Sequence, residues 1–182
     1  MLGNRYVIFI GGKAGAGKST IADELNDVLN TKYKSVVLPV ASSLKRICSF
    51  LGWDGEKDER GRKLLIDCGK VFREYDKDVW IKKSLNTLFS CGKDFDFIII
   101  DDWRYPNEVD FVTEAHVGVP ITFIINRPYS DTLLDSPLGL TDSETSLDKY
   151  RPHGLINNNG TISKEHIVED MYVYIQTMIK EW

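Results

Sequence analysis

The stretch GGKAGAGKST at residues 11–20 combines residue types that suit the binding of a phosphate chain. Its glycines let successive backbone N–H groups turn toward one anion, and a helix that follows would add its positive dipole end. Lys18 can reach the β- and γ-phosphates, and the Ser19 hydroxyl can ligate Mg²⁺. The neighbouring Thr20 hydroxyl can touch the α-phosphate. The stretch therefore predicts a loop that binds a nucleoside triphosphate together with Mg²⁺.

The pattern G-x-x-x-x-G-K-[ST] is more specific than a glycine-rich turn because its flanks fit as well. An apolar run at residues 5–10 precedes it, and residues 19–29 carry apolar side chains at helical spacing. Strand, glycine loop and helix in this order form the context in which the pattern binds phosphates. We expect the following residues to hold ATP: Gly12, Gly15, Ala16, Gly17, Lys18, Ser19 and Thr20.

Two consecutive acids, Asp101 and Asp102, end a second apolar run at residues 96–102. An acid at the tip of a buried strand can hold Mg²⁺ through water beside the phosphate loop. Aspartates after strands also often cap a loop. We assign the metal-side role to Asp101, with Ser19, and interpret Asp102 as a cap. Arg104 follows, and its planar guanidinium can hold a phosphate with two donors unless it forms a surface salt bridge.

The elements that must position these residues alternate between strand and helix. Strand-like runs occupy residues 5–10, 35–40, 96–102, 120–126 and 155–156. Helical spacing marks residues 19–29, 42–51, 62–75, 77–90, 107–116 and 163–181, the last of these capped by Ser163. This alternation predicts an α/β fold with a parallel sheet whose ligands bind at the carboxyl ends of the strands. Residues 128–152 have no strong period and are predicted to form a long loop.

Composition limits the class of protein. The chain has 182 residues, 42% of them hydrophobic, with a net charge of −4, which suits one α/β domain with a real core. Scattered lysines and arginines argue against a nucleic-acid partner, and no apolar run is long enough for a membrane span. No signal peptide is evident at the N-terminus. Three cysteines without CxxC pairing indicate reduced thiols and a cytoplasmic location: Cys48, Cys68 and Cys91.

Classes of phosphate-loop protein differ in what else they require. A GTPase needs an Asn-Lys-x-Asp base reader, which the Asn-Asn-Asn-Gly of residues 157–160 does not supply. A mechanical ATPase usually carries more chain. A small-molecule kinase needs a helical acceptor segment between the second and third strands and a lid after the fourth. Residues 41–91 and 128–151 occupy those places, so we predict a single kinase domain over residues 1–182.

Six blocks of the chain together resemble one enzyme family. LPVASSLK, GRKLLIDCGKVFREYDKDVW, FIIIDDWRYPNEVDF, ITFIINRP, DSETSLD and GLINNNGTI follow in this order the pattern of the deoxynucleoside monophosphate kinases encoded by bacteriophages. The similarity runs from Val7 to about Val173. The blocks DDWRYPNE and SETSLD…INNNGT are its most specific parts. Animal phosphomevalonate kinases look distantly similar over the same blocks.

The resemblance implies a P-loop nucleoside-monophosphate-kinase fold with a five-stranded parallel sheet. It also implies transfer of the γ-phosphoryl group of ATP, with Mg²⁺, to a deoxynucleoside 5′-monophosphate in the host cytoplasm. Carried over by position, Lys45, Arg73 and Arg104 would bind the acceptor's phosphate. Arg127 would lie on the donor side at the lid. Three residues after the last strand would lie against the adenine: Asn157, Asn158 and Gly160. The predicted catalytic residues are then Lys18, Asp101, Arg104 and Arg127.

The chain departs from the family pattern at three places. Residues 140–142 read Leu-Thr-Asp, where an acidic or histidine-containing start is common, and residues 41–43 read Ala-Ser-Ser, where Asp-Pro is commoner. The predicted lid has no arginine between Arg127 and Arg151, so which arginine neutralises the transition state stays open. The pair Ser143-Glu144 either caps a helix or touches a ligand.

Two alternatives to this function remain at the level of sequence. One is a kinase for another small phosphorylated metabolite, such as phosphomevalonate. The other is a nucleotide-binding P-loop module without transfer activity, against which the pairing of Asp101 with Arg104 argues. The expected partners are small-molecule nucleotides, without nucleic acid or membrane, and a homodimer is left open.

Overall fold

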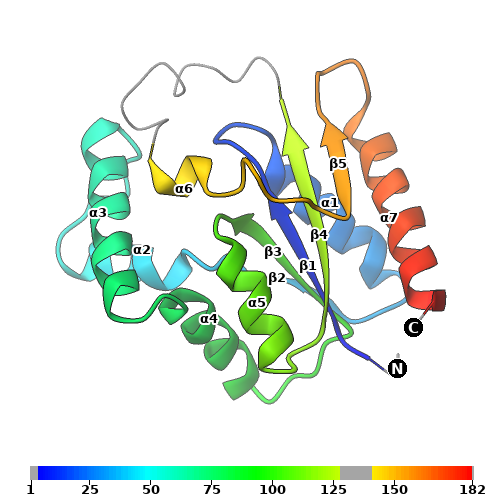
Figure 1. Ribbon diagram of the computed structural model, residues 1–182, viewed down its shortest axis with the longest axis horizontal. Helices are drawn as coiled ribbons and strands as arrows, with labels where there is room; N and C mark the ends of the chain where they lie inside the picture. The colour runs from blue at the N-terminus through cyan, green and yellow to red at the C-terminus, as the bar shows by residue number, and fades with distance from the viewer. Residues whose placement is uncertain (1–3, 128–140, 182) are drawn as a thin grey trace. The chain divides into compact units, whose positions relative to one another are not determined.

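The computed structural model describes residues 4–127 and 141–181 of the chain (Figure 1). The chain consists of two compact units. One is built from the residues up to Leu38 and from Asp94 onward, and the other is Pro39–Lys93. The first unit contains the sheet and the glycine loop. The second has bounds close to those of the predicted acceptor-binding insertion at residues 41–91.

Within the described residues, five parallel strands form one sheet in the order β2-β3-β1-β4-β5. The strands are β1 (Tyr6–Gly11), β2 (Ser35–Val37), β3 (Phe97–Trp103), β4 (Val119–Asn126) and β5 (Gly154–Asn157). The predicted α/β fold with a five-stranded parallel sheet is confirmed. Because β1 lies between β3 and β4, the loop that follows β1 emerges at the middle of the sheet's carboxyl edge.

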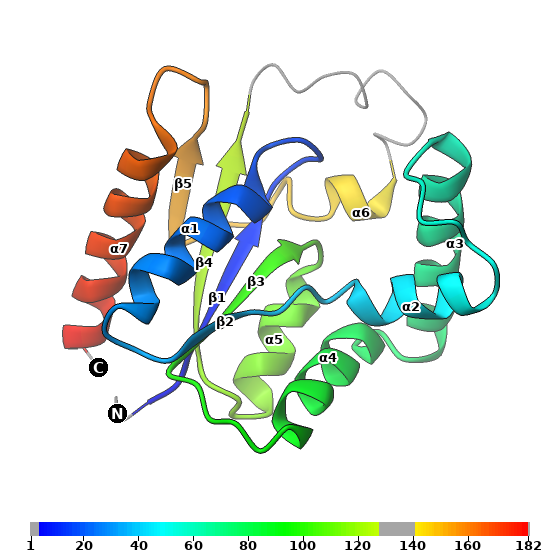
Figure 2. The same cartoon turned by 180° about the vertical axis from the view of Figure 1, so that it is seen from behind.

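Helices cover both faces of this sheet, as Figures 1 and 2 show from opposite sides. Helices α1 (Lys18–Asn30) and α7 (Lys164–Glu181) pack on one face, and α5 (Pro106–Glu114) packs on the other. Alternate strand side chains meet the apolar stripes of α1 and α7 and form a core without solvent exposure, including Ile8, Ile10, Phe97, Ile99, Ile121, Leu25, Leu29 and Ile175. Continuous apolar runs in the sequence therefore correspond to strands that are buried on both faces.

In the 39–93 unit, all of which is described, the helices are α2 (Ser42–Phe50), α3 (Glu59–Tyr75) and α4 (Val79–Ser90). The indole N–H of Trp80 in α4 donates to the carbonyl of Gly69 in α3 at 3.2 Å, and the Phe72 ring meets the indole edge-on. Helix α3 begins three residues before the predicted start. The reason is Asp58, whose carboxylate accepts the Gly61 N–H at 2.7 Å as an N-cap.

Two further predicted elements differ from the structure, and the other bounds shift by one or two residues. Strand β2 ends at Val37 instead of residue 40, because Pro39 has no N–H for the sheet. The predicted loop at residues 128–152 contains the short helix α6 (Asp142–Thr145), which is too short to show a period in the sequence. Residues 128–140 of the predicted lid lie outside the described residues. The Ser163 cap is confirmed by its bond from the His166 N–H, at 3.3 Å.

Two other expectations can be compared with the structure. None of the described helices is both long and apolar enough to cross a bilayer. The three cysteines, which all fall in the described part of the chain, form no disulfide.

Candidate functional site

The loop between β1 and α1 has a shape that side chains would prevent. Gly12, Gly15 and Gly17 have φ angles of +134°, +78° and +91°, in the region that glycine adopts most easily. A Cβ atom on Gly12 would also lie only 2.3 Å from the carbonyl oxygen of Ile125 in β4. The loop therefore packs closely against the sheet at its start. It then curls over the N-terminus of α1, where backbone N–H groups are available to an anion.

Lys18 folds back across this loop. Its Nζ donates to the carbonyls of Gly12, at 2.9 Å, and Lys13, at 2.7 Å, and the residue is only 8% exposed. Burial, and then the nearby Arg104, lower the pKa of the Lys18 ammonium to about 8. The carboxylates of Glu144, Asp101 and Asp102 oppose this shift of the pKa. An anion bound in the loop would offset the cost of burying this charge.

A hydroxyl and a carboxylate meet beside the loop. Ser19 Oγ donates to Oδ2 of Asp101, at 2.6 Å, and so joins the start of α1 to the end of β3. Asp101 is 6% exposed, and its Oδ1 has no hydrogen-bond partner among the described residues. A buried carboxylate oxygen without a partner is costly, and a bound cation or water would remove that cost. Asp102 follows where the pairing of β3 with β1 shifts register, and its charge acts on Lys18 together with that of Asp101, so its role as a cap stays a prediction.

These two side chains fit Mg²⁺. The ion prefers oxygen ligands and often takes only one or two from the protein, with water and phosphate oxygens completing its octahedron. The described residues contain no group of three or more His, Cys, Asp or Glu that could hold a metal by themselves. Ser19 and Asp101 would hold the ion, which supplies positive charge next to the phosphates when it is bound.

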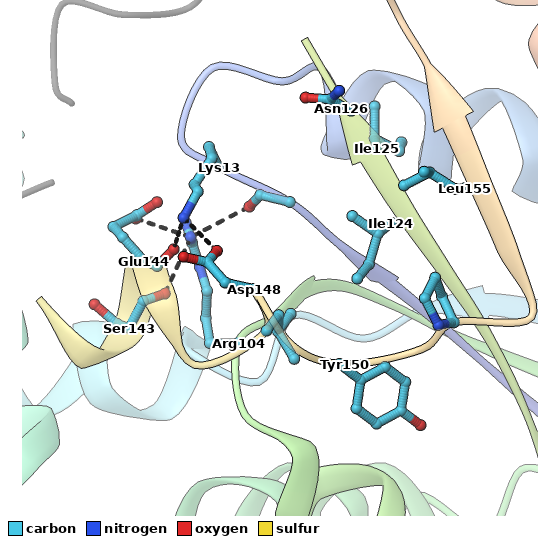
Figure 3. Close-up of a pocket in the computed structure, with 13 residues that line it drawn as sticks. Lys13, Arg104, Ile124, Ile125, Asn126, Ser143, Glu144, Asp148, Tyr150 and Leu155 are labelled. Carbon is cyan, nitrogen blue, oxygen red and sulfur yellow. Dashed lines mark hydrogen bonds and ion pairs between the residues drawn. The ribbon is translucent and has the colours of Figure 1, made fainter. Parts of the chain in front are cut away.

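Arg104 contacts both the phosphate loop and the sequence block SETSLD. Its Nη1 donates to the carbonyls of Gly12 and Ser143, both at 3.3 Å, and pairs with Oε1 of Glu144 at 2.8 Å (Figure 3). The second carboxylate oxygen of Glu144 accepts the backbone N–H of Ala14 at 3.1 Å. The guanidinium is thus fastened to the phosphate loop directly and through one carboxylate.

The same segment forms contacts that the sequence did not predict. Lys13 Nζ donates to the carbonyl of Glu144 and pairs with Asp148 Oδ1 at 2.6 Å. Ser146 Oγ donates to the carbonyl of Arg104. The signal available in the sequence was the acid spacing in SETSLD, where Glu144 and Asp148 are four residues apart. Their cationic partners lie roughly 40 and 130 residues away along the chain, which spacing alone cannot reveal.

A cavity of about 300 Å³ opens beside these charged groups. One wall is apolar and comes from Ile124, Leu147, Tyr150, Pro152 and Leu155, whereas Lys13, Arg104, Glu144 and Asp148 line the charged end (Figure 3). A volume of this size is at the lower end for small-molecule sites. The arrangement can take an apolar or aromatic group next to an anion.

Of the residues predicted on the donor side, Arg127 contacts the loop and Thr20 follows it in α1. Arg127 is exposed, and its Nη1 donates to the carbonyl of Gly15 at 3.3 Å. Thr20 is exposed in the first turn of α1. Both positions are therefore open to a ligand that extends from the loop toward solvent.

Of the three residues predicted to lie against adenine, Asn158 contacts the loop from just after β5. The Asn158 side-chain amide donates to the carbonyl of Ala16 at 2.9 Å, and its backbone N–H donates to Asn126 at 2.8 Å. Asn157 accepts a long bond, 3.5 Å, from the Asn126 amide. Gly160 has a φ of +80° and open space where a side chain would be. The structure gives Asn158 a supporting contact with the loop, and the contact with adenine stays a prediction.

The remaining predicted acceptor residues, Lys45 and Arg73, belong to the 39–93 unit. Lys45 is half-buried on α2. Arg73 lies on α3 with its guanidinium over Gly69, where an added Cβ would come within 2.9 Å of Nη1. Their part in binding an acceptor stays a prediction.

Comparison with known proteins gives the fold. No family model matches the chain, and no curated protein matches it. Among solved structures, the shikimate kinase from Acinetobacter baumannii in complex with shikimate is 14% identical, covers 96% of this chain and 94% of its own, and has a TM-score of 0.51. The APS kinase from Mycobacterium tuberculosis in complex with AMPPNP and APS is 13% identical, with coverages of 95% and 98% and a TM-score of 0.50.

A third structure, from Chloroflexus aurantiacus and provisionally described as a kinase, is 16% identical over 96% of this chain and 97% of its own, with a TM-score of 0.53. These likenesses show that the chain has the fold of P-loop small-molecule kinases. At such low identity they extend to the fold alone.

Proposed function

We propose that this protein is an ATP- and Mg²⁺-dependent kinase that transfers the γ-phosphoryl group to a deoxynucleoside 5′-monophosphate. The observation that carries the proposal is the pairing of Ser19 with the buried Asp101, whose second oxygen lacks a partner within the described chain, beside a glycine loop that encloses Lys18. A nucleotide–metal complex would satisfy all three groups. The acceptor class rests on the resemblance of the six sequence blocks.

In this proposal, the chain's own residues do the work of positioning and of neutralising charge. The loop N–H groups would hold the β-phosphate, and Lys18 would follow the charge that develops on the transferred group. Ser19 and Asp101 would hold Mg²⁺. No general base is required, because the attacking oxygen of an acceptor phosphate is already an anion at neutral pH.

Arg104 is proposed to grip the acceptor's phosphate. In the part of the chain that the structure describes, the bonds of its guanidinium all involve Nη1. With respect to residues 4–127 and 141–181, the N–H groups on Nε and Nη2 are therefore available as a two-donor fork for an anion. The resemblance proposes the same role for Lys45 and Arg73 of the 39–93 unit.

Replacing Arg104 or Arg73 with lysine is expected to raise the KM for the acceptor and leave the KM for ATP nearly unchanged. Lysine keeps the charge but loses the planar fork. A lost charge-assisted hydrogen bond corresponds to about 10- to 150-fold in catalytic efficiency. Separate steady-state titrations of the two substrates measure the effect. Variants that weaken ATP alone would show that these arginines do not serve the acceptor.

ATP binding at pH 8 is expected to take up about half a proton, because Lys18 in the empty loop has a pKa of about 8 and is then half neutral. The triphosphate raises this pKa, so the lysine gains a proton on binding. At pH 6.5 the lysine is already charged, and its contribution should vanish. Calorimetry in two buffers of different ionisation enthalpy measures the uptake, and Lys18→Ala is the control that should abolish it. An uptake that persists in Lys18→Ala would assign the proton to another group.

A coupled assay with a panel of acceptors tests the function itself. The panel contains the deoxynucleoside and ribonucleoside monophosphates, phosphomevalonate and a blank without acceptor. We expect Mg²⁺-dependent release of ADP with at least one deoxynucleoside monophosphate. Activity with phosphomevalonate alone would replace the proposed acceptor. ATP binding without transfer to any acceptor would leave only a nucleotide-binding module.

A further inference from the structure

One carboxylate connects the phosphate loop to the proposed acceptor grip. Glu144 uses both of its oxygens: Oε1 pairs with Arg104 Nη1 at 2.8 Å, and Oε2 accepts the Ala14 N–H at 3.1 Å. The two side chains are only 16% and 24% exposed. A pair this shielded from water is a firmer link than an exposed one, because solvent screens it less.

The alternative role for this residue, capping α6, does not account for the carboxylate. Thr141 is the N-cap of α6, so Glu144 is at the third helical position, where a capping glutamate would reach back to the N-cap backbone. Its carboxylate instead bonds Ala14 and Arg104, which belong to other elements.

We infer that Glu144 is a positioning residue, which fixes the guanidinium of Arg104 so that its Nε and Nη2 face an acceptor phosphate. This inference rests on the proposed function. Without the carboxylate, the described residues leave Nη1 with two backbone contacts at 3.3 Å, those with Gly12 and Ser143. Because the same carboxylate accepts the Ala14 N–H, it also fixes the position of the Arg104 guanidinium relative to the loop proposed to bind the donor. Donor and acceptor phosphates would thus be aligned through one side chain.

Glu144→Gln tests this role, because it keeps the shape of the side chain and removes its charge. The matched control is Asp142→Asn, which removes an equal charge from an exposed residue of the same helix. We expect Glu144→Gln to lower kcat/KM for the acceptor about tenfold, with the dissociation constant for ATP unchanged. Asp142→Asn should match the wild type. In the Arg104→Lys background, Glu144→Gln should have little further effect.

A second readout does not depend on activity. In ¹⁵N spectra of the arginine side chains, the Arg104 guanidinium should rotate slowly about its Nε–Cζ bond in the wild type and in Asp142→Asn. In Glu144→Gln the rotation should be fast. A glutamine variant whose Arg104 signals match the wild type would overturn the inference, whatever the kinetics show.

Two other outcomes would also overturn the inference. One is that Glu144→Gln binds ATP more tightly while its kcat/KM for the acceptor is unchanged. The carboxylate would then compete with phosphate instead of positioning Arg104. The other is that Glu144→Gln and Asp142→Asn lower kcat/KM for the acceptor equally in an active enzyme. Glu144 would then act only through the net charge of the segment. Should the wild type transfer no phosphoryl group at all, the proposed function has failed, and the spectra still decide whether Glu144 fixes Arg104.

Discussion

Replacing Lys18 with alanine is expected to lower turnover by a factor on the order of 10³ and to leave the fold intact, by analogy with other lost electrostatic donors. The ammonium is held at the loop by the Gly12 and Lys13 carbonyls, where the charge of a transferring phosphoryl group would develop. The fold should not depend on this charge. Burial lowers the pKa of Lys18 to about 8, which means that the charged form is disfavoured in the folded protein.

Two measurements check this prediction. Turnover is compared with that of Lys13→Ala, a lysine of the same loop that pairs with Asp148 and should matter far less. Stability is followed against pH. Since the folded-state pKa lies below the ordinary value of 10.5, wild-type stability should gain from Lys18 as the pH rises from about 8 to 10.5, and the alanine variant should lack this gain. A folded Lys18→Ala protein with near-normal turnover would rule out the phosphate-loop assignment.

Replacing Asp101 with asparagine is expected to abolish Mg²⁺-dependent activity. The amide can still accept the Ser19 hydroxyl, so the contact between α1 and β3 can survive. It has no negative charge for the metal, however, and a neutral group would replace the buried carboxylate, whose Oδ1 has no partner among the residues that the structure describes. Titration of activity against Mg²⁺, with circular dichroism to verify folding, measures the loss.

The neighbouring acid provides the control. Asp102→Asn removes the same charge one residue along β3, from a residue predicted to cap a loop instead of holding the metal, and should reduce activity much less. Small and equal effects of the two substitutions would return the pair to the role of loop caps.

The sheet and the glycine loop could be predicted because their signals are local. Buried parallel strands appear as apolar runs such as residues 97–101, and the loop is defined by eight consecutive positions. Element ends were less predictable where one residue decides them. Asp58 starts α3 early through its cap, and Pro39 removes an N–H that β2 would need.

The contacts around Arg104 could not be predicted by the same reasoning. Sequence assigned the guanidinium to a phosphate, but its partners Gly12 and Glu144 come from segments that only the fold brings together. Helix α6 has four residues, which are too few to give a periodic pattern of apolar side chains in the sequence. The SETSLD motif identified Glu144 as a candidate residue, but it did not show what the carboxylate contacts.

The support of the loop by distant segments also has a consequence for synthesis on the ribosome. Residues 12–19 emerge early, yet Gly12 is shaped against the backbone of Ile125, and Ala16 is held by the side chain of Asn158. At ordinary rates of translation, on the order of ten seconds separate the first of these residues from the last. Throughout that interval the nascent chain carries the nucleotide motif without its supports. We therefore expect cellular ATP to bind, and to stabilise the fold, only after residue 158 has left the exit tunnel.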